Sequence, residues 1–91
     1  MEKLENLIEV KKEHGLHARP ATIFVQLANK FNSSVRIEKD SEVIDGKSII
    51  AILSLGVNSG MKVKLIIEGD DSQEAMQDLA NFLQTDSDDS V

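Results

Sequence analysis

The chain of 91 residues has no cysteine, no tryptophan and no tyrosine, and only three phenylalanines and one proline. Without cysteine there is no disulfide framework, no zinc–thiolate site and no thiol nucleophile. Because aromatic side chains are so few, the core must be aliphatic, and the bases of a nucleic acid would find little to stack on. No hydrophobic run approaches the roughly 20 residues of a membrane-spanning helix, so we expect no insertion into a membrane.

Basic residues are also scarce, since 10 Lys and Arg stand against 16 Asp and Glu, for a formal net charge of −6. This balance again argues against nucleic acid as a direct partner. The segment Met1–Glu5 lacks the basic and then hydrophobic pattern of a secretion signal, so we expect a cytoplasmic location. The length suits one domain, residues 1–85, and we expect the acidic segment 86–91 to be a disordered tail.

The single proline points to the start of a helix. Proline has no amide hydrogen, and a helix tolerates it best in the first turn. From Pro20 onward, hydrophobic residues recur at helical spacing. A helix is therefore predicted to begin at or just after His17 and to end near Lys30 or Phe31. Gly15 gives the preceding loop its backbone freedom.

A histidine at the start of a helix suits phosphoryl chemistry. The amides of Ala18 and Arg19 would point outward beside the imidazole of His17, where the positive end of the helix dipole favours anions. Arg19 adds a permanent charge and a forked donor. The dipole also favours the neutral, nucleophilic form of the ring. A nucleophilic ring nitrogen among groups that bind anions would suit a phosphoryl acceptor at His17. The basic side chains around this motif are predicted to form one patch for an acidic partner: Lys11, Lys12, Arg19 and Lys47.

Two other interpretations of this histidine stay open. His17 can be an ordinary surface or capping residue at a helix start. His14 and His17, with Glu13, also raise the question of a metal site. A further well-placed ligand would have to come from elsewhere in the chain, so we expect neither a metal nor a cofactor.

Hydrophobic alternation predicts strands over residues 4–10, 35–38, 43–44 and 61–68. A last helix follows Asp71, which has capping-box spacing to Glu74. The hydrophobic side of that helix is predicted to carry Ala75, Met76, Leu79, Phe82 and Leu83. Each strand has a polar face, so the order βαββαβα predicts an α+β fold with a four-stranded antiparallel sheet and three helices on one face.

The segment after Gly46 is ambiguous. Its β-branched residues allow a strand, but Ser48 is a favoured N-cap, so we predict a short helix that leaves Ile50 partly exposed. A phosphate on Ser48 would meet the positive end of that helix. It would also add negative charge beside Ile50 and Leu53 and so repel a partner docked there. A plain capping serine is the alternative.

Two blocks carry a family resemblance. Residues 15–21, GLHARPA, resemble the active-site signature of HPr, the histidine-containing phosphocarrier of the bacterial phosphotransferase system. Residues 47–57, KSIIAILSLGV, resemble the regulatory-serine segment of the same family. The resemblance extends from about Leu7 to Leu83. It implies the open-faced β-sandwich of that family.

The resemblance also implies roles and partners. His17 would take a phosphoryl group from enzyme I, with Arg19 beside it, and pass it to the IIA domains of sugar-specific permeases. The chain would thus be a carrier rather than an enzyme. Ser48 would be modified by an HPr kinase/phosphorylase, and the product would bind the catabolite control protein, a transcriptional regulator. The docking surface would be formed by Ile49, Ile50 and Leu53.

This chain departs from the family in three places. Methionine is common where it has Ile50 and Leu53, and the stiffer isoleucine would narrow the range of partners. His14 replaces a small polar residue, and the acidic tail is longer than usual. A paralogous class, the catabolite-repression HPr, has glutamine in place of the active histidine. His17 argues against that class, but a regulatory protein acting mainly through Ser48 is the alternative.

Overall fold

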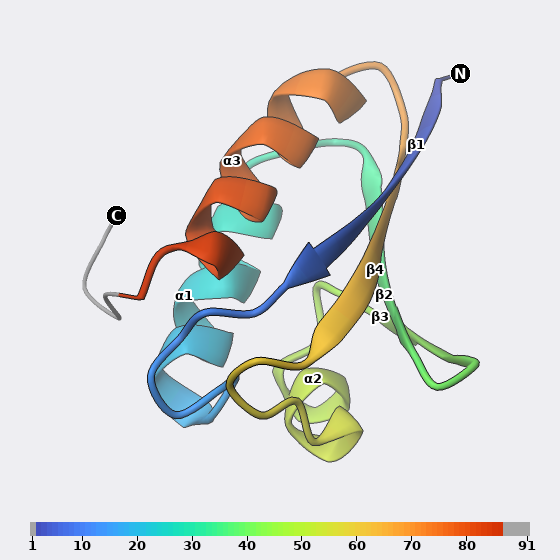
Figure 1. Ribbon diagram of the computed structural model, residues 1–91. Coiled ribbons are helices and arrows are strands. Elements are labelled where there is room, and N and C mark those ends of the chain that lie inside the picture. The colour runs from blue at the N-terminus through green and yellow to red at the C-terminus, as the bar shows by residue number, and fades with distance from the viewer. Residues whose placement is uncertain (1, 87–91) are drawn as a thin grey trace.

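The structure is a computed structural model that describes residues 2–86, so the expected tail beyond Asp86 lies outside the described residues. Its elements confirm the predicted order βαββαβα (Figure 1). In chain order they are β1 (Lys3–Glu9), α1 (Ala18–Ala28), β2 (Ser34–Lys39), β3 (Glu42–Asp45), α2 (Ile49–Leu55), β4 (Lys62–Glu68) and α3 (Ser72–Gln84). Among these residues no helix has the length and hydrophobicity needed to cross a bilayer.

The strands of the described chain form one antiparallel sheet in the order β1-β4-β2-β3. The register sets Ile8 opposite Val63 and Ile37 opposite Leu65, so the hydrophobic side chains of three strands lie on the same face. The helices cover that face: α3 packs on β1 and β4, α1 packs on α3, and α2 lies against α1 and β3 (Figure 1). The predicted α+β fold is therefore confirmed.

The core between the sheet and the helices is aliphatic, as its composition predicts. Ile8, Ile37, Leu65 and Leu79 are fully buried within it. Phe24 of α1 and Phe82 of α3 bring their ring centroids to 6.4 Å, which joins the two helices.

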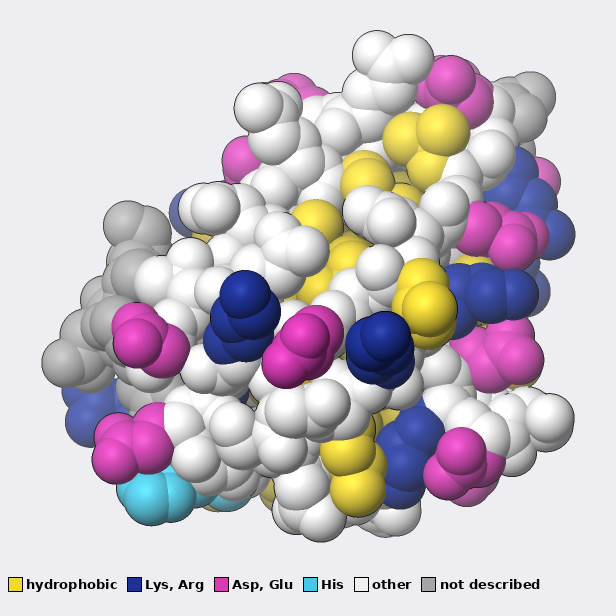
Figure 2. Space-filling model, viewed as in Figure 1, with side chains coloured by type: hydrophobic (Ala, Val, Ile, Leu, Met, Phe, Trp, Pro, Cys, Tyr) yellow, Lys and Arg dark blue, Asp and Glu magenta, His cyan; other side chains and the backbone are white. Residues whose placement is uncertain are grey.

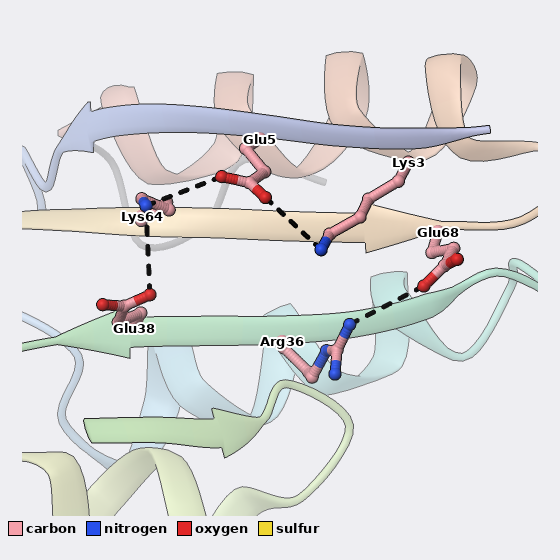
Figure 3. A network of polar contacts seen from close by, with 6 residues as sticks. All are labelled: Lys3, Glu5, Arg36, Glu38, Lys64 and Glu68. Carbon is pink, nitrogen blue, oxygen red and sulfur yellow. Dashed lines mark ion pairs between the residues drawn. The ribbon is translucent and has the colours of Figure 1, made fainter. Parts of the chain in front are cut away.

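The opposite face of the sheet carries charged side chains (Figure 3). Ion pairs with N–O distances of 3.5–4.0 Å run across it. They link Lys3, Glu5, Lys64 and Glu38 in a chain, and Arg36 to Glu68. Such exposed pairs stabilise a fold by only about 1 kcal/mol or less each. Their main effect is to make this face polar and hydrated.

The prediction that the first helix reaches Lys30 or Phe31 is wrong, because α1 ends at Ala28. The amides of Lys30 and Phe31 donate to the carbonyls of Leu27 and Ala28, which are i→i−3 bonds. The helix therefore tightens into a final turn before β2. Phe31 is still buried, which is why the helical spacing runs past the end of the helix.

The predicted capping box at Asp71 is also wrong. Asp71 precedes α3, but its carboxylate makes no cap hydrogen bond. It instead accepts the backbone amides of Asn32 and Ser33, each at 2.9 Å, and the hydroxyl of Ser33. The Ser33 hydroxyl and the Asn32 amide hold the pKa of the Asp71 carboxyl below its ordinary value of 3.8. Asp71 thus fixes the α1–β2 connection to the start of α3.

Candidate functional site

The helix α1 begins where the proline predicts. His17 is the N-cap residue, with an extended backbone (φ −78°, ψ −173°), and its carbonyl accepts the amide of Ala21 at 3.0 Å. Pro20 is buried in the first turn. His17 is partly exposed, and Ala18 and Arg19 beside it are exposed. The imidazole therefore lies at the positive end of α1, where first-turn amides point outward.

The loop that presents His17 is held by its backbone. Gly15 has φ +73° and donates its amide to the carbonyl of Lys12 at 3.0 Å, and the buried Leu16 donates to Val57 at 2.9 Å. A Cβ atom at residue 15 would collide with the carbonyl oxygen of Val57 and the backbone of Asn58. Glycine is thus required by its positive φ and by the close approach of the segment after α2.

The second histidine of the chain lies next to the first. The ring centroids of His14 and His17 are 5.9 Å apart, with an interplanar angle of 62°. Glu13 Oε2 is 3.9 Å from His14 Nε2. Within residues 2–86, no group of three His, Cys, Asp or Glu side chains is placed to hold a metal ion. The open metal-site interpretation therefore gains no third ligand from the described chain.

The predicted basic patch does not form as one surface. Lys12 is fully buried, and its Nζ lies 3.7 Å from the centroid of the Phe82 ring, a cation–π contact. Lys47 donates from Nζ to the carbonyl of Phe31 at 2.8 Å. Phe31 follows the C-terminal end of α1, whereas His17 caps the N-terminal end. Lys11 and Arg19 are exposed as expected. The prediction is wrong for Lys12 and Lys47, because only the tertiary packing decides where a lysine side chain ends.

Ser48 caps a helix rather than beginning a strand. Its Oγ accepts the amide of Ala51 at 3.2 Å, and α2 follows over Ile49–Leu55. At the other end of α2, Gly56 is left-handed (φ +70°), and Lys39 Nζ donates to the carbonyls of Leu55 and Gly56 at 3.0 and 3.2 Å. The sequence alone does not predict this role of Lys39, because nothing in the local pattern links a residue at the end of β2 to α2.

The helix α2 presents hydrophobic side chains to solvent. Ile50 is 77% exposed, Leu53 41% and Ile49 37%, whereas Ile52 and Leu55 face the core. Lys47, just before α2, reaches Phe31 after the end of α1, and Val57, just after α2, holds the His17 loop. This helix therefore spans the distance from Ser48 to the loop of His17. In Figure 2 hydrophobic side chains emerge at the lower edge over α2, and the histidines lie at the lower left.

Comparison with known proteins decides the family. Residues 4–85 match the family model described as the PTS HPr component phosphorylation site. The chain belongs to the HPr family. Members of this family are phosphocarrier proteins and not catalysts.

This HPr-family chain is similar both to carriers and to regulatory relatives. It is 48% identical to the HPr-like protein Crh of Halalkalibacterium halodurans over 89% of its own length and 96% of the relative. The crystal structure of a phosphocarrier protein HPr from Bacillus anthracis matches it with a TM-score of 0.89 at 38% identity, covering 92% of this chain and all of that one. The solution structure of Crh, the Bacillus subtilis catabolite repression HPr, matches with a TM-score of 0.70 at 44% identity over the same shares.

Proposed function

We propose that this HPr-family chain carries a phosphoryl group on His17, taking it from enzyme I and giving it to sugar-specific IIA domains. The observation that supports this most is the partly exposed imidazole at the N-terminal end of α1, with Arg19 in the first turn. A ring nitrogen of His17 attacks the phosphorus, a P–N bond forms, and the bond to the donor breaks. The reverse exchange on a IIA domain frees the imidazole again.

The proposed carrier has to bind its phosphoryl group without trapping it. First-turn amides, including those of Ala18 and Arg19, and the Arg19 guanidinium would offset the charge of the group. An exposed site with few such donors lets successive partners reach the phosphorus in line. The exchange would take place in the cytoplasm, where enzyme I and the IIA domains would meet the protein.

Labelling by enzyme I tests this proposal. The purified protein, incubated with enzyme I and phosphoenolpyruvate, is expected to take up one phosphoryl group that is labile in acid and stable in base. His17→Ala should abolish the label, whereas His14→Ala, which removes the neighbouring ring, should retain it. A His17→Ala variant that is still labelled would refute the assignment of the acceptor.

A regulatory role through Ser48 is the second candidate, favoured by the 48% identity to a Crh protein. In this alternative an HPr kinase/phosphorylase modifies Ser48, and the product binds a transcriptional regulator, the catabolite control protein, through Ile49, Ile50 and Leu53. Ser48 is partly exposed and its hydroxyl caps α2, and a phosphate there could still accept first-turn amides.

Sugar uptake separates the two candidates. The gene is expressed in a strain that lacks its phosphocarrier, as the wild type and as the His17→Ala and Ser48→Ala variants. The carrier proposal predicts that uptake is restored by the wild type and by Ser48→Ala, and lost with His17→Ala. Failure of the wild type to restore uptake, with regulation that depends on Ser48, would favour the regulatory candidate.

A further inference from the structure

His14 is the feature of this surface that the proposed function leaves unused. Its side chain is 70% exposed, and its ring lies edge to face with the ring of His17 at 5.9 Å between centroids. A phosphoryl group attached to His17 on the side that faces His14 would therefore lie beside a second imidazole.

The loop geometry holds the backbones of the two histidines close together. The two histidines flank Gly15 and Leu16, whose backbones are bonded to Lys12 and Val57 at 3.0 and 2.9 Å. Since Gly15 also packs on the backbone of Asn58, the chain between the two rings has little freedom to separate them.

Phosphorylation would give His17 nearly two negative charges next to this second ring. A neutral imidazole can donate one N–H to a phosphoryl oxygen, and the protonated ring has two N–H donors and a positive charge. Hydrogen bonds between charged groups are about twice as strong as neutral ones. Histidine also changes its charge close to neutral pH, unlike the side chains of Lys, Arg and Glu.

We propose that His14 is a phosphoryl-binding residue, which donates from its imidazole to the phosphoryl group on His17 and holds that group more tightly as the pH falls. This inference rests on the proposed carrier function. It makes the free protein a better phosphoryl acceptor, and the phosphorylated protein a weaker donor, in acid than at alkaline pH. No proton is transferred in the step, because His14 keeps its proton and only shares it with a phosphoryl oxygen.

Charged neighbours act on this ring in opposite ways. Glu13 Oε2, 3.9 Å from His14 Nε2, would attract the protonated ring away from the phosphoryl group. Arg19, in the exposed first turn of α1, adds a permanent positive charge to the same site. Segment 56–60, which backs the loop, contains no titratable side chain.

The test compares wild type with two variants of fixed charge, His14→Gln and His14→Lys. Each protein is equilibrated with a catalytic amount of enzyme I and a fixed ratio of phosphoenolpyruvate to pyruvate, at pH 6 and at pH 8.5. The phosphorylated fraction is then measured on a native gel. An equilibrium is not altered by how fast enzyme I docks, and comparison within one pH removes the pH dependence of the donor.

At pH 6 the ratio of phosphorylated to free wild type should match His14→Lys and exceed His14→Gln by about two- to fivefold, as for an exposed charge pair. At pH 8.5 the wild type should match His14→Gln. A wild type that follows one variant at both pH values would overturn the inference. If the wild type is not labelled at either pH, the proposed carrier function itself fails, and the two failures are therefore distinct.

Discussion

At the scale of single residues, the presentation of His17 depends on neighbours that act in different ways. Pro20 and the helical spacing after it are local signals, so the start of α1 could be predicted from the sequence. The bond from Leu16 to Val57 joins distant parts of the chain, and no local pattern indicates it. The burial of Lys12 under Phe82 was missed for the same reason, since it requires knowing where α3 packs.

Gly15 tests how firmly this loop holds His17. Gly15→Ala is expected to lower the free energy of unfolding by roughly 3 kcal/mol, because a left-handed alanine is strained and its Cβ meets Val57. Gly60→Ala is the matched control, since Gly60 also has a positive φ (+87°) but open space around a Cβ. It should cost only about 1 kcal/mol, the strain alone. Urea unfolding of both variants measures these two costs. Equal losses of unfolding free energy would contradict a loop that packs closely at Gly15.

At the scale of elements, local signals could again be predicted from the sequence, and contacts between distant parts of the chain could not. Ser48 as an N-cap follows from a rule about one turn, and it correctly favoured a helix over a strand for residues 49–55. Asp71 has the same kind of signal, with Glu74 three positions on, yet its carboxylate turns to Asn32 and Ser33. A tertiary partner can offer more hydrogen bonds than the local cap, and spacing alone does not reveal which one wins.

Asp71 should make stability depend on pH. Its pKa is lower in the folded protein than the ordinary 3.8, so the carboxylate stabilises the fold above that pH, and this contribution is lost as the pH falls through the folded value. Asp71→Asn should therefore unfold at a lower urea concentration than wild type at pH 7. The difference in urea midpoint between Asp71→Asn and wild type should shrink in strong acid, below the ordinary carboxyl pKa of 3.8.

The neighbouring Asp70→Asn is the control for this measurement, because Asp70 is exposed and makes none of the bonds to the α1–β2 connection. We expect it to change the urea midpoint little at either pH. If Asp70→Asn and Asp71→Asn were equally destabilised at pH 7, the three hydrogen bonds of Asp71 would not be the cause.

At the scale of the whole molecule, the two faces of the protein differ in what they can bind. The open face of the sheet carries exposed ion pairs (Figure 3). The edge formed by α2 and the His17 loop instead joins exposed hydrophobic side chains to the proposed acceptor. The order of elements and the antiparallel sheet could be predicted from alternation and periodicity. The way α2 connects the surroundings of Ser48 to the loop of His17 could not be predicted, because it depends on how α2 packs against α1.

Ile50 tests whether this edge is the docking surface. Ile50→Glu should leave the free energy of unfolding within about 0.5 kcal/mol of wild type, because the side chain is 77% exposed. It should slow phosphoryl transfer from enzyme I about tenfold or more, as loss of a hydrophobic anchor does. Leu7→Glu is the matched control, since Leu7 is 63% exposed on the open face of the sheet. Equal transfer rates for the two variants would rule out docking through α2.

The central claim is that His17 both receives and returns a phosphoryl group, and a chase experiment tests it most directly. Protein labelled with radioactive phosphate by enzyme I is freed of enzyme I and mixed with a purified IIA domain. The radioactivity should move to the IIA domain within the mixing time, leaving this chain unlabelled and able to be labelled again. Label that stays on this chain, or that leaves it only as inorganic phosphate at the same rate with and without the IIA domain, would contradict a carrier function.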